Sequence, residues 1–385
     1  MVVDPAGEVS TARHVSGTGE GYAALDVGAT VGVEEEFHIV DPRTGDLVPA
    51  ARRVLRRTAG QAESELQRSI VETASAVHAD LASLRRDLVA RRRRLAEAAA
   101  GVGLAVATVG TVPASGTHRG RVFPEPRYEW MAAEYQQLVD EQQVCACQVH
   151  VSVADRDLAV RITRRIRGWL PVLLAMSASS PYFQGEDTGY ASYRNIVVSR
   201  WPTVGPPPDF ESAAEYDQTV ASLVHSGVIV DAGMVYFDAR LSARYPTIEV
   251  RVADGCPSVD DAVLLAALCR ALVVIAARTG DETTVPSSPQ VLLRAAMWRA
   301  ARSGLDGLLV DPLTFRAVPA PDMVRALLEH LRPVLQERGE WDEVAALAGA
   351  LLARGTSARQ QREAMRRGRS KATVVAELVA ETATG

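Results

Sequence analysis

The sequence predicts an α+β fold that is built around an antiparallel sheet. Strand-like and helix-like segments follow one another irregularly along the 385 residues, without the strand–helix rhythm that is typical of a parallel sheet. Several predicted strands also carry polar side chains at every second position, opposite their apolar residues. With 47% hydrophobic and 23% charged residues, the composition excludes collagenous, coiled-coil and wholly disordered chains.

Charge and cysteine content narrow the classes of function. The net charge is −5, so we expect no nucleic-acid partner bound through bulk positive charge. The only lysine is Lys371, and no Walker-type or dinucleotide-binding glycine motif is present. Phosphate would therefore have to be bound by arginine, metal ions and backbone amides. Cys145 and Cys147 belong to a set of four cysteines, too few for a disulfide scaffold, and are expected in the core.

The chain is expected to form one domain after a flexible tail. Residues 1–28 are polar and glycine-rich and lack the apolar run of a signal peptide. The longest apolar run, residues 263–277, carries Arg270 and is shorter than the roughly 20 residues that span a bilayer. We therefore expect a soluble cytoplasmic protein without membrane contact, with its folded part in residues 29–385.

Local patterns predict the elements in chain order. Residues 29–40 form a strand, and turn-forming residues 41–46 make it one arm of a hairpin. Residues 79–100 form a helix, because its leucines share one face and glycines follow its end. Later elements are strands 104–111, 145–153, 228–241 and 247–254, helices 155–175 (capped by Asp155) and 263–277 (capping box Ser258 and Asp261), and a mostly helical region from about 290.

Two arginine-rich segments are expected to be solvent-exposed helix surface rather than binding sites. The run Arg91–Arg94 lies on the first predicted helix, where consecutive side chains point in different directions. We therefore expect a solvated face rather than a nucleic-acid patch. The basic stretch 359–371 could fold over a site, but a solvated helix is the favoured interpretation.

Polar residues share one face on the first two strands with this pattern. Glu34 and Glu36 lie on the same face as His38, opposite Val33 and Phe37. In the strand 145–153, Gln148, His150 and Ser152 lie opposite the apolar residues. Taken singly, each pattern also fits an exposed sheet face or a hydrogen-bonded histidine.

Two later strands repeat the pattern. Asp238 and Arg240 share a face with Tyr236, and Glu249 shares one with Arg251. A cross-strand ion pair would explain either strand alone. Four such strands together predict a sheet face that binds hard cations and an anionic substrate, because carboxylates with histidine suit Mg²⁺ or Mn²⁺ and arginine binds phosphate or carboxylate.

A fifth segment adds Glu65 and Glu72, which are seven residues apart. On a helix they would share a face, across a loop and a strand they need not, and simple surface glutamates are also compatible with the spacing.

Several motifs together resemble the bacterial carboxylate–amine ligases, the type 2 glutamate–cysteine ligase family. They are Gly32–Phe37, the Glu65–Glu72 segment, Ser179–Pro181, Gly189–Arg194, Ser199–Thr203, Tyr245–Asp254 and Trp298–Arg302. The resemblance runs from about residue 30 to the C-terminus. It implies one ligase catalytic domain at 29–385, like that of glutamine synthetase: a curved antiparallel β-sheet funnel with helices packed on its outer face.

The resemblance also implies a reaction. ATP and two or three Mg²⁺ or Mn²⁺ ions would bind the inner face of the sheet, and a glutamate-like carboxylate would become an acyl phosphate. Cysteine or another amine would then displace phosphate to form an amide. Two alternatives remain, a metal-dependent phosphotransferase on the same fold and a non-catalytic nucleotide-binding relative. A homodimer is possible.

Residue roles follow from the same resemblance. The implied metal ligands are Glu34, Glu36, Glu65, Glu72, His150 and Glu249, with Gln148 a weaker candidate. Glu249 and Arg251 are the implied catalytic pair, with Arg251 facing the γ-phosphate. Substrate or phosphate would contact Arg194, Arg200 and Arg240, the amine would meet Tyr190 and Tyr193, and the motif of Trp298, Arg299 and Arg302 matches without an assigned role.

Two positions depart from the family pattern. The family commonly has Gly-x-His-x-His where this chain has Ala146–His150, so that Gln148 replaces a histidine. Residues 295–297 are Ala-Ala-Met, where acidic or amide residues are common in the family. Both departures affect expectations about the nucleotide or the metal.

Overall fold

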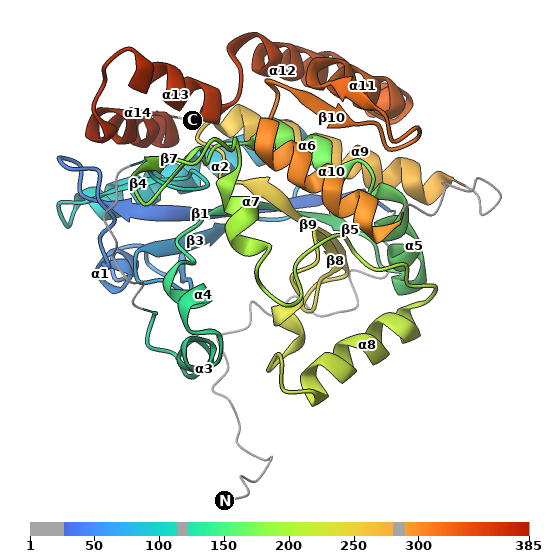
Figure 1. Cartoon of the computed structure of the whole chain (residues 1–385), viewed down its shortest axis with the longest axis horizontal. Coiled ribbons are helices and arrows are strands. Elements are labelled where there is room, and N and C mark those ends of the chain that lie inside the picture. The colour runs from blue at the N-terminus through green and yellow to red at the C-terminus, as the bar shows by residue number, and fades with distance from the viewer. Residues whose placement is uncertain (1–26, 114–121, 280–288, 385) are drawn as a thin grey trace, which may run out of the picture.

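A computed structural model of the chain describes residues 27–113, 122–279 and 289–384. Its centre is a seven-stranded sheet in the order β2-β3-β1-β5-β9-β8, with β4 paired to β1, and every pair is antiparallel (Figure 1). The strands are β1 (Val31–Val40), β2 (Glu63–Ser64), β3 (Ile70–Ala74), β4 (Ala105–Ala107), β5 (Ala146–Ser152), β8 (Ala239–Leu241) and β9 (Thr247–Asp254). The predicted antiparallel sheet is confirmed.

Helices cover one face of this sheet. The helix α9 (Val259–Arg278) is buried along most of its length, because it lies between the sheet and an outer layer of helices. It packs with α2 (Leu81–Ala100), α5 (Arg156–Ile166) and α6 (Leu170–Ser177), and the outer layer contains α10 (Gln290–Ser303), α11 (Ala320–Glu337) and α12 (Trp341–Arg354). Helices α13 (Ser357–Arg366) and α14 (Lys371–Thr384) complete this side.

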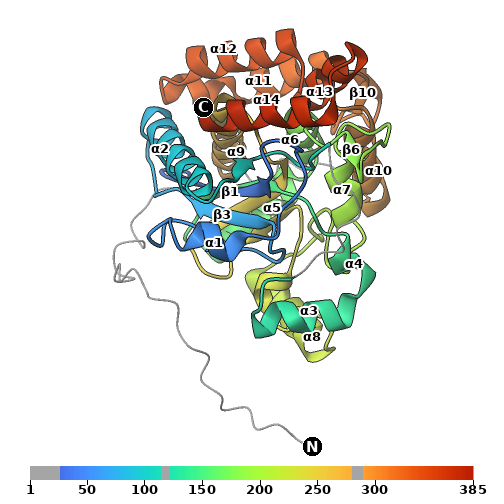
Figure 2. The same ribbon diagram turned by 90° about the vertical axis from the view of Figure 1, so that its left-hand side faces the viewer.

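The other face of the sheet is flanked by short elements. Figure 2 shows α3 (Pro126–Tyr135) and α8 (Ala213–His225) on the side opposite α9 and α11. The remaining elements are α1 (Ala51–Leu55), α4 (Gln137–Asp140), α7 (Tyr193–Val198), a 3-10 turn (Ala232–Met234) and the hairpins β6 (Tyr182–Phe183)–β7 (Glu186–Asp187) and β10 (Leu308–Val310)–β11 (Ala317–Pro319). This uncovered face is the one that carries the polar residues.

Several predicted elements are confirmed at nearly their expected bounds. The first strand is β1, and the turn after it closes when Asp41 N–H donates to the carbonyl of Asp46. The first helix is α2, whose N-cap Asp80 accepts from Ser83 N–H. Asp155 caps α5 as predicted, by accepting from Leu158 N–H. Residues 1–26 of the predicted tail lie outside the described residues.

Two predicted elements are wrong in extent. The helix expected at 155–175 is broken into α5 and α6, because Gly168 and Pro171 interrupt the helical hydrogen bonds between them. The strand expected at 228–241 is reduced to β8, preceded by the 3-10 turn. There Arg240 donates to the carbonyls of Gly233 and Val235, so a side chain takes the place of a strand partner.

Smaller differences concern ends and caps. The strand expected at 104–111 is only β4, and the helix expected at 263–277 begins earlier, as α9. Ser258 caps α9 by accepting from Asp260 N–H, whereas the expected partner Asp261 pairs with Arg354. The predicted helical region after 290 is confirmed in α10 to α14.

The prediction that Arg91–Arg94 form a solvated face is wrong at one position. Arg92 is fully buried and donates to both carboxylate oxygens of Glu35 on β1. Its guanidinium also donates to the carbonyls of Cys256 and Pro257, just after β9. Arg92 points at the sheet because α2 turns that face inward, a placement that a run of identical residues does not reveal.

The basic stretch 359–371 forms α13 and the turn after it, on the helix-covered side. Several of its arginines, including Arg366 and Arg367, are exposed. Among the described residues, no helix combines the length and the apolar character needed to cross a membrane.

Candidate active site

One face of the sheet carries a continuous floor of ionisable side chains. Strand register places Glu36 opposite Glu72, and Glu34 opposite Gln148. On the next strands, Glu249 lies opposite His150 on one side and Arg240 on the other. Directly paired residues share a face of a sheet, so strands that are up to about 200 residues apart build one site.

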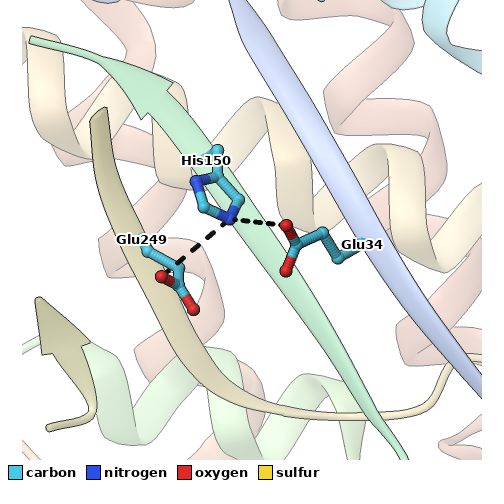
Figure 3. Close-up of side chains that lie close together, drawn as sticks. All are labelled: Glu34, His150 and Glu249. Atoms are coloured by element: carbon cyan, nitrogen blue, oxygen red, sulfur yellow. Dashed lines mark ion pairs between the residues drawn. The ribbon is translucent and has the colours of Figure 1, made fainter. Parts of the chain in front are cut away.

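Glu34, His150 and Glu249 form the tightest cluster on this floor, which we call the histidine cluster. Their ligand atoms lie within 4.8 Å of one another (Figure 3). His150 Nε2 is 3.3 Å from Glu34 Oε1 and 4.0 Å from Glu249 Oε2. The other ring nitrogen, Nδ1, lies 2.9 Å from Thr247 Oγ1, which fixes the ring orientation. Two carboxylates and an oriented imidazole can hold a divalent cation.

The two carboxylates of the histidine cluster are held in the charged form. Burial tends to raise the pKa of Glu249, but the charges of Arg251 and Arg240 outweigh it and keep the pKa well below its usual range. Arg240 binds Glu249 through two hydrogen bonds of 2.8 and 3.0 Å. Burial also acts to raise the pKa of Glu34, and the neighbouring His150 lowers it overall.

Glu36, Glu65 and Glu72 form a second group, which we call the glutamate cluster. Burial, followed by the charge of Glu65, raises the pKa of Glu36 to about 7. The pKa of Glu72 lies well above its usual range because burial combines with repulsion from Glu34, Glu65 and Glu36. Carboxylates that lie close together repel one another as anions, and a cation between them relieves that repulsion.

The segment of Glu65 and Glu72 is not helical. Glu63 in β2 pairs with Glu72 in β3, so the chain turns back on itself between them. This hairpin brings Glu65 near the other acids, and burial raises its pKa. The two glutamates are half-buried in the site rather than on an open surface.

Gln148 connects the floor of the site instead of offering a free ligand. Its Nε2 donates to Glu36 Oε1 at 3.1 Å, and its Oε1 accepts from Arg251. Both ends of the Gln148 amide are therefore engaged. The family commonly has histidine at this position, whereas here the amide oxygen accepts from arginine. Arg251 also donates to Glu249, and its guanidinium lies 5.6 Å from the centre of the Tyr236 ring.

Two cavities open on the polar floor. The first lies against Glu34 and His150, and Val77 and Tyr245 in its wall are 58% and 55% exposed. The second, which we call the arginine cavity, is lined by acids, three arginines and aromatic rings. Its polar and aromatic lining includes Glu36, Glu65, Arg127, Tyr128, Gln142, Arg194, Asn195, Trp201, Tyr236, Asp238 and Arg251.

The three arginines expected at substrate or phosphate have different surroundings. Arg194 is buried in the wall of the arginine cavity. Arg240 is occupied by Glu249 and two backbone carbonyls. Arg200 is exposed, donates to Glu141, and is absent from the lining of both cavities.

The aromatic and arginine motif at α10 forms a separate group. Trp298 Nε1 donates to Tyr190 Oη at 3.2 Å, and Tyr190 and Tyr193 meet edge to face at 5.8 Å. Arg302 lies 5.7 Å from the Tyr190 ring and Arg299 lies 5.9 Å from the Trp298 ring. None of these five residues lines either of the two cavities.

Sequence reasoning assigned no role to the residues that position the arginine cavity. Asp254 at the end of β9 accepts from Ser179 N–H, Ser180 Oγ and Ser192 Oγ. The Ser180 hydroxyl in turn accepts from the backbone N–H of Arg194, so this buried cluster holds α7 against the sheet. These residues all lie in motifs that carry the family resemblance, but spacing within each motif does not show that the motifs meet.

Arg127 was also missed. It lies on α3 and donates to Asp231 at 2.9 Å, from a segment with no recognisable motif. The alternative considered for the strand of Asp238 and Arg240, a cross-strand ion pair, holds for Arg240, which pairs with Glu249. Asp238 Oδ2 has no hydrogen-bond partner among the described residues. Burial raises the pKa of Asp238 to about 7, against the charge of Arg194.

Comparison with known proteins agrees with the sequence motifs. The model of glutamate–cysteine ligase family 2 matches residues 30–380. Relatives named after glutamate–cysteine ligase 2 include one from Frankia casuarinae, 51% identical over 91% of this chain, and one from Salinispora arenicola, 46% identical over 88%. The chain spans 41% of the Frankia protein and 90% of the Salinispora protein.

Solved structures show the same fold at low sequence identity. A glutamate–cysteine ligase from Francisella tularensis in complex with AMP matches with a TM-score of 0.70 and 10% identity, over 92% of this chain and 88% of that one. A bifunctional glutathione synthetase from Pasteurella multocida matches with a TM-score of 0.67 and 15% identity, over 92% of this chain and 52% of that one.

Proposed function

This chain belongs to glutamate–cysteine ligase family 2, and on that premise we propose that it is an ATP-dependent ligase that joins a small-molecule carboxylate to an amine. The observation that carries the proposal is the pairing of the histidine cluster and the glutamate cluster on one sheet face, with Arg251 between Glu249 and Gln148. A glutamate-like acid and cysteine or another amine are the proposed substrates, and a homodimer in the cytoplasm remains an expectation.

The donor set fits divalent cations. The histidine cluster offers an oriented imidazole and two anionic carboxylates, and the glutamate cluster offers three acids whose pKa values are raised by burial. We propose that these six residues hold Mg²⁺ or Mn²⁺. Such ions would neutralise the phosphates of ATP and the carboxylate that approaches them.

The two cavities suit different substrates. Exposed apolar and aromatic side chains, Val77 and Tyr245, stand beside the histidine cluster and suit the base and ribose of a nucleotide. The arginine cavity, beside the glutamate cluster, suits the carboxylate substrate. The transferring phosphoryl group would then lie between them, next to Arg251.

The residues on the floor can then assist an in-line transfer. A carboxylate oxygen of the substrate bonds to the γ-phosphorus while the bond to ADP breaks, giving an acyl phosphate. The amine nitrogen next bonds to the acyl carbon, phosphate leaves with its electron pair, and the nitrogen loses a proton. Arg251 would bind the phosphoryl oxygens as their charge shifts, and Glu249 would hold Arg251 in place. No protein nucleophile is needed for this sequence.

Phosphate release tests the proposal directly. Purified protein is given ATP, Mg²⁺ and glutamate, with cysteine and a panel of other amines, and phosphate is measured with and without each amine. Hydroxylamine should trap the acyl phosphate as a hydroxamate, whereas a phosphotransferase would yield a stable phosphorylated product. Glu249→Gln should abolish amine-dependent release, and Glu337→Gln, an exposed change on α11, should leave it intact. Absence of both turnover and ATP binding would leave only the fold.

A further inference from the structure

A cleft on the helix-covered face of the sheet takes no part in the proposed reaction. It has a volume of about 330 Å³ and is formed by the turn after α1, the second half of α2 and Thr73 of β3. Helix α1 packs with both α2 and β3 in this region (Figure 2). Thr73 lies opposite Glu35 in the strand register, so both side chains lie on the face turned away from the polar floor. We call this space the Thr73 cleft.

Three arginines but only one acid line this cleft. Arg91 and Arg94 are three residues apart and so share a face of α2, and Arg57 joins them from the turn after α1. Ion pairs already occupy Arg91, which lies 2.8 Å from Asp87, and the single acid Glu97, which lies 3.0 Å from an exposed arginine. The cleft therefore carries an excess of positive charge in a protein whose net charge is −5.

Arg57 and Arg94 also offer hydrogen-bond donors. In the part of the chain that the structure describes, Arg94 donates through Nε alone, to the carbonyl of Ala90 at 3.1 Å. Within the same residues, the Arg57 guanidinium makes no hydrogen bond or ion pair. It packs against Gly101 at the end of α2, where an added Cβ would lie 2.5 Å from Arg57 Nε. Two guanidinium groups thus bring available donors to one cleft.

Thr73 adds a buried hydroxyl to these donors. The residue is only 4% exposed, and its Oγ1 has no hydrogen-bond partner among the described residues. A buried polar atom without a partner costs free energy, whereas valine would fill the same space without that cost. The hydroxyl therefore calls for a ligand that reaches into the cleft.

Guanidinium groups and a hydroxyl together form a donor set that complements phosphate oxygens. We propose that the Thr73 cleft binds a small phosphate monoester, whose phosphate contacts Arg57 and Arg94 and accepts a hydrogen bond from the Thr73 hydroxyl. The apolar side chains of Ala62 and Leu95 in the same lining would contact its carbon atoms. The volume lies at the lower end of the range for small-molecule sites, which fits a ligand of this size.

Calorimetric titration tests this site without turnover. Chelator-treated protein is titrated, without ATP and at ionic strength held constant with sodium chloride, with glycerol 3-phosphate, inorganic phosphate, succinate or glycerol. The variants are Arg57→Gln, Arg94→Gln and Thr73→Val. The matched control is Arg86→Gln, which changes an exposed arginine of α2 outside the cleft lining.

We expect the wild type to bind glycerol 3-phosphate more tightly than inorganic phosphate or succinate, and glycerol not to bind. Each arginine variant should raise the dissociation constant about 10-fold, the low end for a charge-assisted hydrogen bond, because both side chains are exposed. Thr73→Val should raise it about 5-fold while leaving the melting temperature equal or higher, since it removes an unpaired buried hydroxyl. Arg86→Gln should match the wild type.

Several results would overturn the proposal. One is a wild type that does not bind glycerol 3-phosphate, and another is binding that Arg57→Gln and Thr73→Val leave unchanged. An equal loss in Arg86→Gln would show general charge attraction, and succinate bound as tightly as glycerol 3-phosphate would refute the phosphate assignment. Glu249→Gln should bind glycerol 3-phosphate like the wild type, because the polar floor is on the other face. The test therefore stands apart from the ligase proposal.

Discussion

Arg251 contacts the polar floor and the ring of Tyr236, and it is the residue proposed to bind the transferring phosphoryl group. Its guanidinium binds Gln148 and Glu249 and lies over Tyr236. Lysine would keep the positive charge but lose the planar set of donors that reaches several partners at once.

We therefore predict that Arg251→Lys lowers kcat by about 100-fold with little change in KM for ATP, as for an interaction made mainly in the transition state. Steady-state kinetics at varied ATP checks this. Arg93→Lys, on the exposed side of α2, should have no effect. A rise in KM for ATP at constant kcat would instead assign Arg251 to ground-state binding.

His38 gives a stability prediction that depends on pH. Burial lowers the pKa of His38 to about 4, from the ordinary value of 6.5. Between these values the unfolded chain binds a proton that the folded chain does not, so stability falls as pH falls from 6.5 toward 4. The full difference is worth about 3 kcal/mol.

Urea unfolding of the wild type and of His38→Gln at several pH values tests this prediction. The variant should lose most of the decline between pH 6.5 and 4, although its stability at pH 7.5 can differ because of the repacked core. Parallel curves for the two proteins would show that other groups cause the decline. His225→Gln, at the end of α8, is the exposed control.

At the scale of elements, the ion pair between Arg92 and Glu35 joins α2 to β1. Both side chains are fully buried, and Arg92 also binds the two carbonyls that follow β9. Glu35 lies on β1 between Glu34 and Glu36, with its side chain on the opposite face. The pair thus fixes the strand that presents a ligand from each proposed metal cluster.

Breaking this pair from one side should be costly. We predict that Arg92→Leu destabilises the protein by about 3–5 kcal/mol, because it leaves the Glu35 carboxylate buried without a partner. The double variant Arg92→Leu, Glu35→Leu should recover part of that loss. Chemical unfolding curves measure both, and Arg93→Ala in the same arginine run should cost less than about 0.5 kcal/mol. A double variant as unstable as the sum of its single changes would refute the coupling.

At the scale of the whole molecule, the acids of the polar floor destabilise the fold without metal and favour the binding of cations. Burial and mutual repulsion raise the pKa values of Glu36 and Glu72 in the protein without metal. A cation that binds only the folded state would remove this repulsion and add its binding free energy to stability.

We predict that Mg²⁺ or Mn²⁺ raises the melting temperature of protein treated with chelator. At a concentration 100 times the dissociation constant, the gain is about 2.7 kcal/mol. Glu72→Gln should be more stable than the wild type without metal and gain less from it. Scanning calorimetry across metal concentrations measures both effects. An unchanged melting temperature in the wild type would argue against the proposed sites.

The sequence by itself determined the antiparallel strands, the alternation that separates apolar from polar faces, and the acids and the histidine that gather on one of them. These features depend on spacing within a single segment, where a period of two places residues on one face. The motifs were also sufficient to identify the family.

Only the tertiary structure decided which segments became neighbours. In the structure β1 lies between β3 and β5, Arg92 is buried, and Arg240 binds Glu249. The Trp298 motif lies outside both cavities, and Asp238 and Arg194 line the same cavity. Each of these outcomes depends on contacts between segments far apart in the chain. Hydrophobic periodicity fixes which face a side chain occupies, but not what packs against that face.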